Sequence, residues 1–177
     1  ADIKGMQIRS TGLSAKMVQA LGATPVAMPQ GDTYEALQKG VVEGTFAPME
    51  TLKGWRQGDV IDYTTNCQEI GYTTTMFAVM NKEKFNQLPE EVRDVINNVS
   101  NEWIEVHGQV WDDADKEGLA YTREQGNEII ELSQEQSARW KDAILPVIDD
   151  YITDARENGL EGQKSVDLLR SLIEKQN

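Results

Sequence analysis

The sequence predicts an α/β fold, with a mostly parallel sheet in the first part of the chain and long helices in the C-terminal part. Two observations lead to this prediction. Over the first 80 residues, short apolar segments alternate with segments whose apolar residues recur at helical spacing. Because the links between them are short, the strands are expected to be parallel with right-handed crossovers. The second half of the chain keeps helical spacing over much longer stretches.

Three short strands are expected in the first half, each followed by a helix. The strands are predicted at "KGMQIRS" (4–10), "TPVAMP" (24–29) and "VVEGTF" (41–46). The helices are predicted at "LSAKMVQALG" (13–22), "GDTYEALQKG" (31–40) and "PMETLKGW" (48–55). Gly22 and Gly40 are expected to end the first two helices. Asp32 is expected to cap the second helix, and Pro48 to lie in the first turn of the third.

The elements of the second half follow from the same patterns. A longer strand is predicted at "EIGYTTTMFAVMN" (69–81), whose two sides both carry apolar residues, as in a sheet interior. One long helix is predicted over residues 88–126. Its apolar stripe comprises Val92, Val95, Ile96, Val99, Trp103, Val106 and Val110. A brief strand at "NEIIEL" (127–132) precedes a helix over 133–158. Ser133 and Gln136 have the spacing of a capping box at the start of this helix, and Pro146 should kink it. A last amphipathic helix is predicted over 162–177.

The composition excludes several classes of function. The apolar content of 39% is too high for a disordered chain, and 177 residues suffice for one domain or two small lobes. A net charge of -13 disfavours nucleic acid and anionic membranes as partners. With one cysteine and one histidine, histidine-based zinc sites and most nucleophile–histidine sets lack parts. We therefore expect no enzyme, no metal and no cofactor.

Three residues follow predicted strands at what should be one edge of the sheet: Arg9, Gln30 and Phe46. Ligands of open parallel sheets bind outside the carboxyl ends of the strands. Arginine recognises carboxylates through two parallel hydrogen bonds and keeps its charge. From position alone, Arg9 is either a carboxylate-binding residue or an ordinary surface arginine.

An alternative function rests on acidic residues of the second half. The segment "DADKEGLAYTRE" places oxygen ligands at calcium-loop spacing, at Asp113, Asp115, Glu117 and Glu124, with Gly118 at the position of the sharp turn. However, no exit helix is readable after Glu124, so a charged helix face is favoured. The alternative is a calcium-binding or helical protein-interaction module, and calcium should then raise its melting temperature.

Three stretches resemble the substrate-binding proteins of tripartite ATP-independent periplasmic (TRAP) transporters, the DctP-like family. They are "IRSTG" (8–12), "VQALGATPVAMPQGDTYEALQKGVVEGTFAP" (18–48) and "MNKEKFNQLPEEVRDVI" (80–96). The resemblance implies a periplasmic-binding-protein-like fold of two α/β lobes. It also implies a periplasmic, non-enzymatic protein that traps a small organic acid by hinge closure and delivers it to a membrane permease. Arg9 matches the arginine that binds the substrate carboxylate in this family.

The chain departs from the family pattern at two positions of the expected site. Ala47 stands where many members have an asparagine, and Gln30 with Gly31 where many have an aromatic residue. The site should therefore have fewer polar contacts, which favours an acid with an apolar, aromatic or branched body. The residues expected to bind the ligand are Arg9, Thr11, Gln30, Phe46, Ala47, Met49 and Tyr72.

The resemblance also predicts a domain organisation. Residues 1–77 should form the ligand-binding segment of the second lobe, 78–125 a crossing strand and long hinge helix, and 126–177 a short strand and C-terminal helices packing on both lobes. The first lobe of the family lies largely before the strand at 4–10, so a truncated fragment is expected. Apolar surfaces left without that lobe should favour a homodimer.

Overall fold

The computed structural model describes residues 3–70 and 72–175. The chain divides into two compact units. Unit 1 comprises Ala1–Phe46, Thr65–Gly71 and Ile130–Asn177, and unit 2 comprises Ala47–Thr64 and Tyr72–Ile129. These units do not coincide with the three segments expected from the sequence, whose roles in a two-lobe protein stay predictions.

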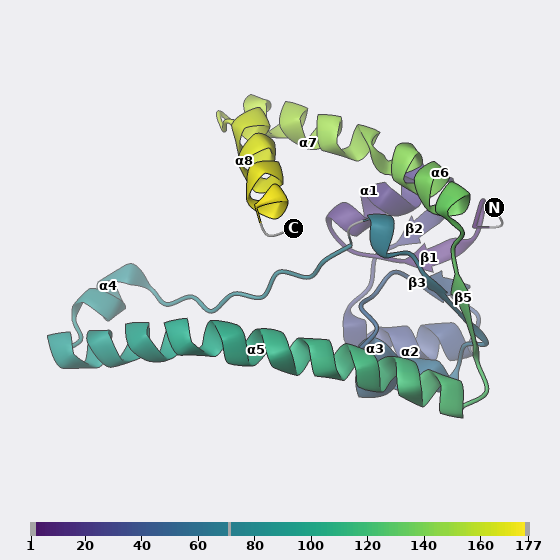
Figure 1. Ribbon diagram of the computed structural model, residues 1–177, viewed down its shortest axis with the longest axis horizontal. Helices are drawn as coiled ribbons and strands as arrows, with labels where there is room; N and C mark the ends of the chain where they lie inside the picture. Colours follow the sequence, from purple (N-terminus) through teal and green to yellow (C-terminus); the bar gives the residue numbers. More distant parts are fainter. Residues whose placement is uncertain (1–2, 71, 176–177) are drawn as a thin grey trace. The chain divides into compact units, whose positions relative to one another are not determined.

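A three-stranded parallel sheet forms the centre of unit 1 (Figure 1). Its strands are β1 (Gln7–Arg9), β2 (Thr24–Val26) and β3 (Gly44–Thr45), in the order β2-β1-β3. The connecting helices are α1 (Leu13–Ala20) and α2 (Gln30–Gln38). Both strand pairs are parallel, which confirms the predicted alternation of short strands and helices.

The apolar core of unit 1 lies between β1 and α1. Ile8, Val18 and Ala23 are buried, and Ile3, Met6 and Phe46 pack against them. Gly22 has φ +85°, the left-handed conformation that ends a helix, and the next N–H, from Ala23, donates to Val18 O at 3.0 Å. The turn therefore returns the chain directly from α1 into β2.

Three helices complete unit 1: α6 (Gln134–Ile144), α7 (Pro146–Glu157) and α8 (Gly162–Glu174). The predicted capping box is confirmed, since Gln136 N–H donates to Ser133 Oγ (3.2 Å) and Ser133 N–H donates to Gln136 Oε1 (2.9 Å). Pro146 begins α7, so the predicted long helix is interrupted at Leu145. The 3-10 turn η2 (Gln68–Ile70) packs against α6.

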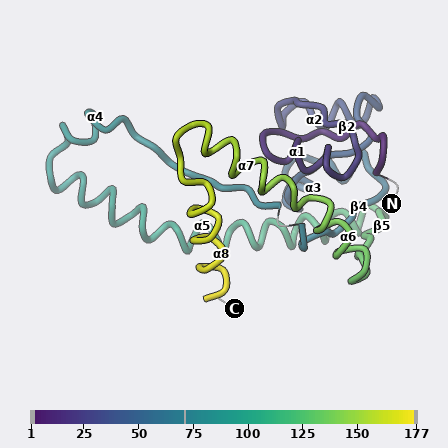
Figure 2. The backbone as a smooth tube through the Cα atoms, turned by 90° about the horizontal axis from the view of Figure 1, so that it is seen from above, coloured from purple at the N-terminus to yellow at the C-terminus, as the bar shows by residue number. Residues whose placement is uncertain are grey.

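Unit 2 is organised around α5 (Glu90–Glu124), a single helix of 35 residues that Figure 2 shows without interruption. Its other helical elements are α3 (Thr51–Gly54), the 3-10 turn η1 (Gln57–Asp59) and α4 (Lys82–Asn86). The predicted long helix is thus confirmed. The turn η1 and the element α3 pack against α5.

The contact between α3 and α5 is close because α5 has a glycine there. A Cβ atom on Gly118 would lie 2.0 Å from Met49 O. Next to it, Asp115 Oδ1 accepts the N–H of Glu50 (2.7 Å), and Lys53 Nζ pairs with Glu117 Oε2 (2.7 Å). Only a residue without a side chain allows the two backbones to approach in this way.

A second hydrogen-bonded group fixes η1 to the C-terminal end of α5. Asn127 Nδ2 donates to Gly58 O (2.7 Å) and to Thr122 Oγ1 (3.1 Å). Tyr121 donates its hydroxyl proton to Asp59, which also pairs with Arg56 at 2.6 Å. The hydrogen bond between Tyr121 and Asp59 is the largest cause that lowers the pKa of Asp59 and raises the pKa of Tyr121.

Two strands carry the chain across the boundary between the units. These strands are β4 (Tyr63–Asn66) and β5 (Glu128–Glu131), and they pair with one another. The boundary crosses β4 after Thr64 and β5 after Ile129. The strand β5 confirms the prediction at 127–132, whereas β4 was not predicted.

The longer strand predicted at 69–81 is wrong. Residues 68–70 form η2, residues 72–81 have no regular structure, and residue 71 lies outside the described residues. A strand needs a neighbouring backbone to complete its hydrogen bonds, and no described strand pairs with 72–81. Its apolar side chains are consequently exposed, with Phe77 at 79% and Val79 at 83%.

Two predicted helix starts also differ from the structure. The helix α2 begins at Gln30, so Asp32 lies in its first turn and does not cap it. The helix α3 begins at Thr51, after a turn at Met49 and Glu50 in which the Glu50 N–H donates to Asp115 Oδ1. None of the described helices is both long enough and apolar enough to cross a membrane.

Candidate ligand-binding site

Arg9 lies at the carboxyl end of β1 and is buried, with 6% of its surface exposed. Its Nε and Nη2 donate to the carbonyl oxygen of Met28, at 3.2 and 3.1 Å. Met28 lies just beyond the carboxyl end of β2. Arg9 is therefore not an ordinary surface arginine, because both of these contacts hold its guanidinium at the carboxyl edge of the sheet.

The strand register places a second polar residue beside Arg9. In the β1–β3 pair, Arg9 is the partner of Thr45, and partners in a parallel pair project to the same face. Thr45 Oγ1, Gln30 Nε2 and Ser10 Oγ are buried atoms without a hydrogen-bonding partner among the described residues. The sequence prediction included Gln30 but missed Thr45 and Ser10, because the register of β3 with β1 and the missing hydrogen bonds are properties of the folded chain.

The other predicted residues of unit 1 lie at the same edge but differ in what their side chains do. Thr11 is exposed, and its N–H donates to Ser14 Oγ (3.1 Å) at the start of α1. Phe46 N–H donates to Arg9 O (2.9 Å), while its side chain packs against the Ile8 core. Phe46 therefore contributes to the core of unit 1 as well as to the edge.

The remaining predicted residues, Ala47, Met49 and Tyr72, belong to unit 2 and are half-buried. The carbonyl group of Met49 packs on Gly118 of α5. Their contact with a ligand stays a prediction from the sequence.

The calcium-loop spacing has no loop to support it. Residues 113–124 are all helical, within α5. Asp113 accepts from Lys116 Nζ (2.9 Å) and Gln109 Nε2 (3.0 Å), and Asp115 is bound to Glu50 N–H. Among the described residues, no group of three or more His, Cys, Asp or Glu side chains is placed to hold a metal ion. The charged helix face favoured from the sequence is confirmed.

Cys67 is not poised for nucleophilic chemistry. Burial raises the pKa of its thiol to about 11. The thiolate is the reactive form, so the thiol is almost entirely protonated at neutral pH. His107, on α5, accepts a hydrogen bond from Trp111 Nε1 (2.8 Å).

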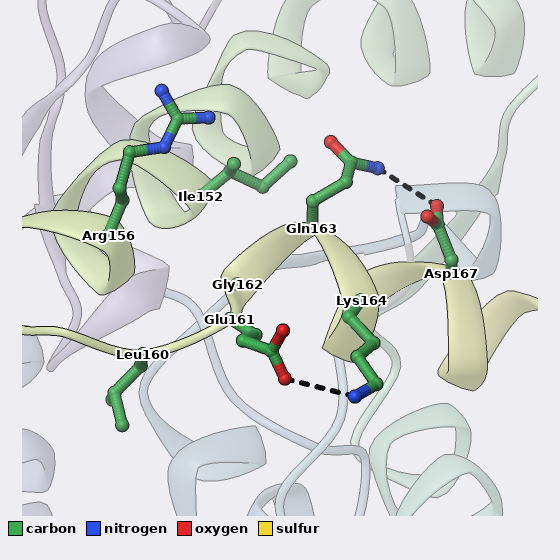
Figure 3. A pocket seen from close by; sticks show the side chains of 8 residues that line it. All are labelled: Ile152, Arg156, Leu160, Glu161, Gly162, Gln163, Lys164 and Asp167. Carbon is green, nitrogen blue, oxygen red and sulfur yellow. Dashed lines mark hydrogen bonds and ion pairs between the residues drawn. The ribbon is translucent and has the colours of Figure 1, made fainter.

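An open hollow of about 480 Å³ lies between α7 and α8 (Figure 3). Four of its polar side chains pair with one another, Lys164 Nζ with Glu161 (3.0 Å) and Gln163 Nε2 with Asp167 (2.9 Å). The hollow contains none of the residues predicted to bind a ligand. The carboxyl edge of the sheet therefore remains the better candidate, on the chemistry of Arg9.

Comparison with known proteins gives one consistent family. The sequence model of the bacterial extracellular solute-binding proteins of family 7, named DctP, matches residues 1–154. The C4-dicarboxylate-binding periplasmic protein DctP of Rhodobacter capsulatus is 28% identical over 148 residues, which are 82% of this chain and 43% of the relative.

Solved structures agree with the family match. A TRAP periplasmic solute-binding protein from Desulfovibrio salexigens is 33% identical, with a TM-score of 0.76 over 97% of this chain and 53% of that one. A marine metagenome TRAP solute-binding protein specific for aromatic acids, in complex with metahydroxyphenylacetate, is 29% identical. Its TM-score is 0.83 over 98% of this chain and 56% of that one.

The chain thus spans about half the length of the relatives it matches. The family match covers well over half of the 177 residues, and the parallel sheet agrees with an α/β periplasmic-binding-protein-like fold. The chain therefore belongs to the bacterial extracellular solute-binding proteins of family 7, the DctP family of TRAP substrate-binding proteins.

Proposed function

We propose that the protein captures a small organic acid in the periplasm and delivers it to the membrane permease of a TRAP transporter, without a catalytic role. The observation that carries this proposal is Arg9, a buried arginine held by the Met28 carbonyl at the carboxyl edge of a parallel sheet. A guanidinium held in this way is preorganised for a carboxylate. The net charge of -13 makes nucleic acid a poor partner.

An acid with an aromatic or branched body is the substrate class that we propose. Ala47 offers no side-chain hydrogen bond, so polar contacts fall mainly on the sheet edge. The metagenome relative, which is similar over 98% of this chain, is specific for aromatic acids. The relative from Rhodobacter capsulatus binds C4-dicarboxylates, so dicarboxylates are the comparison to include in any screen.

A thermal-shift screen of the protein, expressed at its full natural length, tests the proposed function. Organic acids that bind the folded state should raise the melting temperature in a concentration-dependent way. Benzoate and phenylacetate represent the aromatic acids, and succinate the dicarboxylates. Calcium chloride, added alone, should leave the melting temperature unchanged.

The role of Arg9 is tested in the same screen with Arg9→Ala and a matched control, Arg139→Ala. Arg139 is an exposed residue of α6. Arg9→Ala should abolish the rise in melting temperature with every acid that stabilises the unmodified protein. Arg139→Ala should leave each of these rises unchanged. Full carboxylate affinity in Arg9→Ala would show that the site lies elsewhere.

We also infer that the 177-residue chain self-associates. Exposed apolar side chains line α5 and the segment 72–80: Met76, Phe77, Val79, Met80, Val95, Val99, Trp103, Ile104 and Val110. Exposed apolar surface favours association with a second copy. A molecular mass from solution scattering that stays monomeric at all concentrations would contradict this inference.

A further inference from the structure

Two polar atoms near Arg9 are shielded from solvent and lack a hydrogen-bonding partner among residues 3–70 and 72–175. They are Oγ1 of Thr45, on β3, and Nε2 of Gln30, the first residue of α2. Each residue as a whole is only half-buried, so other atoms of both side chains reach the surface. Ser10 Oγ is also unpartnered, but Ser10 is fully buried and out of reach of a ligand.

The backbone brings both residues to the edge where Arg9 lies. Thr45 is the register partner of Arg9, and neighbouring strands lie about 4.8 Å apart. The two side chains therefore leave the same face of the sheet one strand spacing apart. Gln30 follows Met28 by two residues, and Met28 O accepts both hydrogen bonds from Arg9.

An unpaired buried polar atom is unfavourable, because its hydrogen bonds to water are lost and not replaced. The Thr45 hydroxyl group can form a hydrogen bond with a ligand atom that donates or accepts, and the Gln30 amide nitrogen can donate one to an acceptor. Rotation about χ1 moves the Thr45 hydroxyl between staggered positions without moving the strand. The hydroxyl can thus turn toward a ligand atom bound beside Arg9.

We propose that Thr45, together with Gln30, binds a second oxygen of the ligand, and that the site therefore prefers acids with a hydroxyl or carbonyl oxygen close to the carboxylate. This inference rests on the proposed function, in which Arg9 binds the carboxylate. It adds Thr45 as a specificity-determining residue and narrows the substrate class. The apolar body favoured by Ala47 is retained, since only one further oxygen is required.

The substitution Thr45→Val tests the role of the hydroxyl. Valine keeps the β-branched shape that suits a strand and removes only the polar atom. The matched control is Thr24→Val, in β2 of the same sheet: Thr24 is exposed and pairs with Gln7, at the opposite end of the register from Arg9. Mandelate and phenylacetate serve as probes because they differ by one hydroxyl group on the carbon next to the carboxylate.

Calorimetric titration of the protein at its full natural length should show tighter binding of mandelate than of phenylacetate. In Thr45→Val, the preference for mandelate should fall by about tenfold, the size expected for one lost hydrogen bond to a ligand. Phenylacetate affinity should be unchanged. Without ligand, the melting temperature of this variant should be equal or higher, because an unpaired buried hydroxyl has been removed. Thr24→Val should match the unmodified protein in both measurements.

A purely structural role of Thr45 would give a different result. In that case Thr45→Val would weaken both acids equally or lower the melting temperature while keeping the preference for mandelate, and the inference would be overturned. If the unmodified protein binds phenylacetate at least as tightly as mandelate, the inference fails while the proposed function stands. If it binds no organic acid, the proposed function fails, and the inference with it.

Discussion

The two ends of α5 belong to one continuous helix but differ in packing. Toward its C-terminus, Gly118 and Thr122 are buried, and Asp115 accepts the backbone N–H of Glu50, just before α3. Toward its N-terminus, Val99 and Trp103 are exposed, although they belong to a clear apolar stripe. The comparison shows that small and polar residues make the intimate contact of α5, because they let backbones approach. Its large apolar residues Val99 and Trp103 are instead 45% and 58% exposed.

The largest effect is expected from a methyl group at the packed end. Gly118→Ala should lower the free energy of unfolding by about 3 kcal/mol or more, since the new Cβ atom meets backbone that cannot move aside easily. Gly108→Ala, on the same helix, meets nothing within 4 Å. It should raise stability by up to about 1 kcal/mol through helix propensity. Urea unfolding of both variants measures these changes in the free energy of unfolding. Equal changes in the two variants would contradict the proposed difference in packing between the two ends of α5.

The hydrogen bonds next to the packed end should have the second-largest effect. Asn127→Ala removes the donor to Gly58 O and Thr122 Oγ1 and leaves two part-buried acceptors unpaired. A loss of about 1–3 kcal/mol is expected from urea unfolding. Asn98→Ala, at an exposed position of the N-terminal part, is the matched control and should be neutral or slightly stabilising. A neutral Asn127→Ala would mean that η1 is held by other contacts.

A smaller, pH-dependent effect is expected at Glu50. Burial and the nearby Asp115 carboxylate raise the pKa of Glu50 above its ordinary value. Folding therefore favours the protonated form of Glu50. Its contribution to the free energy of unfolding is present below the ordinary glutamate pKa of about 4.3, and it is lost as pH rises through the raised pKa of the folded state. Glu50→Gln should therefore raise the melting temperature at pH 7 and have little effect at pH 3.5. A gain of the same size at both pH values would contradict this assignment.

The smallest effect on stability is expected at the exposed end. Trp103→Gln replaces a side chain that is 58% exposed, so the free energy of unfolding should change by less than about 0.5 kcal/mol. Self-association should nevertheless weaken, because apolar contact area is lost. Sedimentation velocity over a range of concentrations measures this change. Unaltered association in Trp103→Gln would place the contact between copies elsewhere.

Much of the fold could be predicted from the sequence because the signals are local. Gly22 ends α1, Ser133 and Gln136 form their capping box, and Pro146 interrupts the helix at the predicted place. The strand predicted at 69–81 is wrong because apolar residues on both sides of a segment indicate a sheet interior only where neighbouring strands exist. A strand requires a partner, and partners are set by tertiary structure that the local sequence does not contain.

The candidate site was predicted in part. The position of Arg9 after a strand placed it at the correct edge of the sheet, but its burial and its contact with Met28 depend on the packing of β2. Thr45 was missed because a threonine in a strand is an ordinary residue. Its significance comes from the register with Arg9 and from an unpaired hydroxyl, and both are properties of the folded chain.

The most direct test of the central claim is a crystal structure of the protein at its full natural length with a bound organic acid from the thermal-shift screen. We predict that the acid's carboxylate lies within hydrogen-bonding distance of the Arg9 guanidinium, at the carboxyl edge of the β2-β1-β3 sheet. A carboxylate bound at any other place, with Arg9 making only its contacts to the protein, would contradict the proposed role of Arg9.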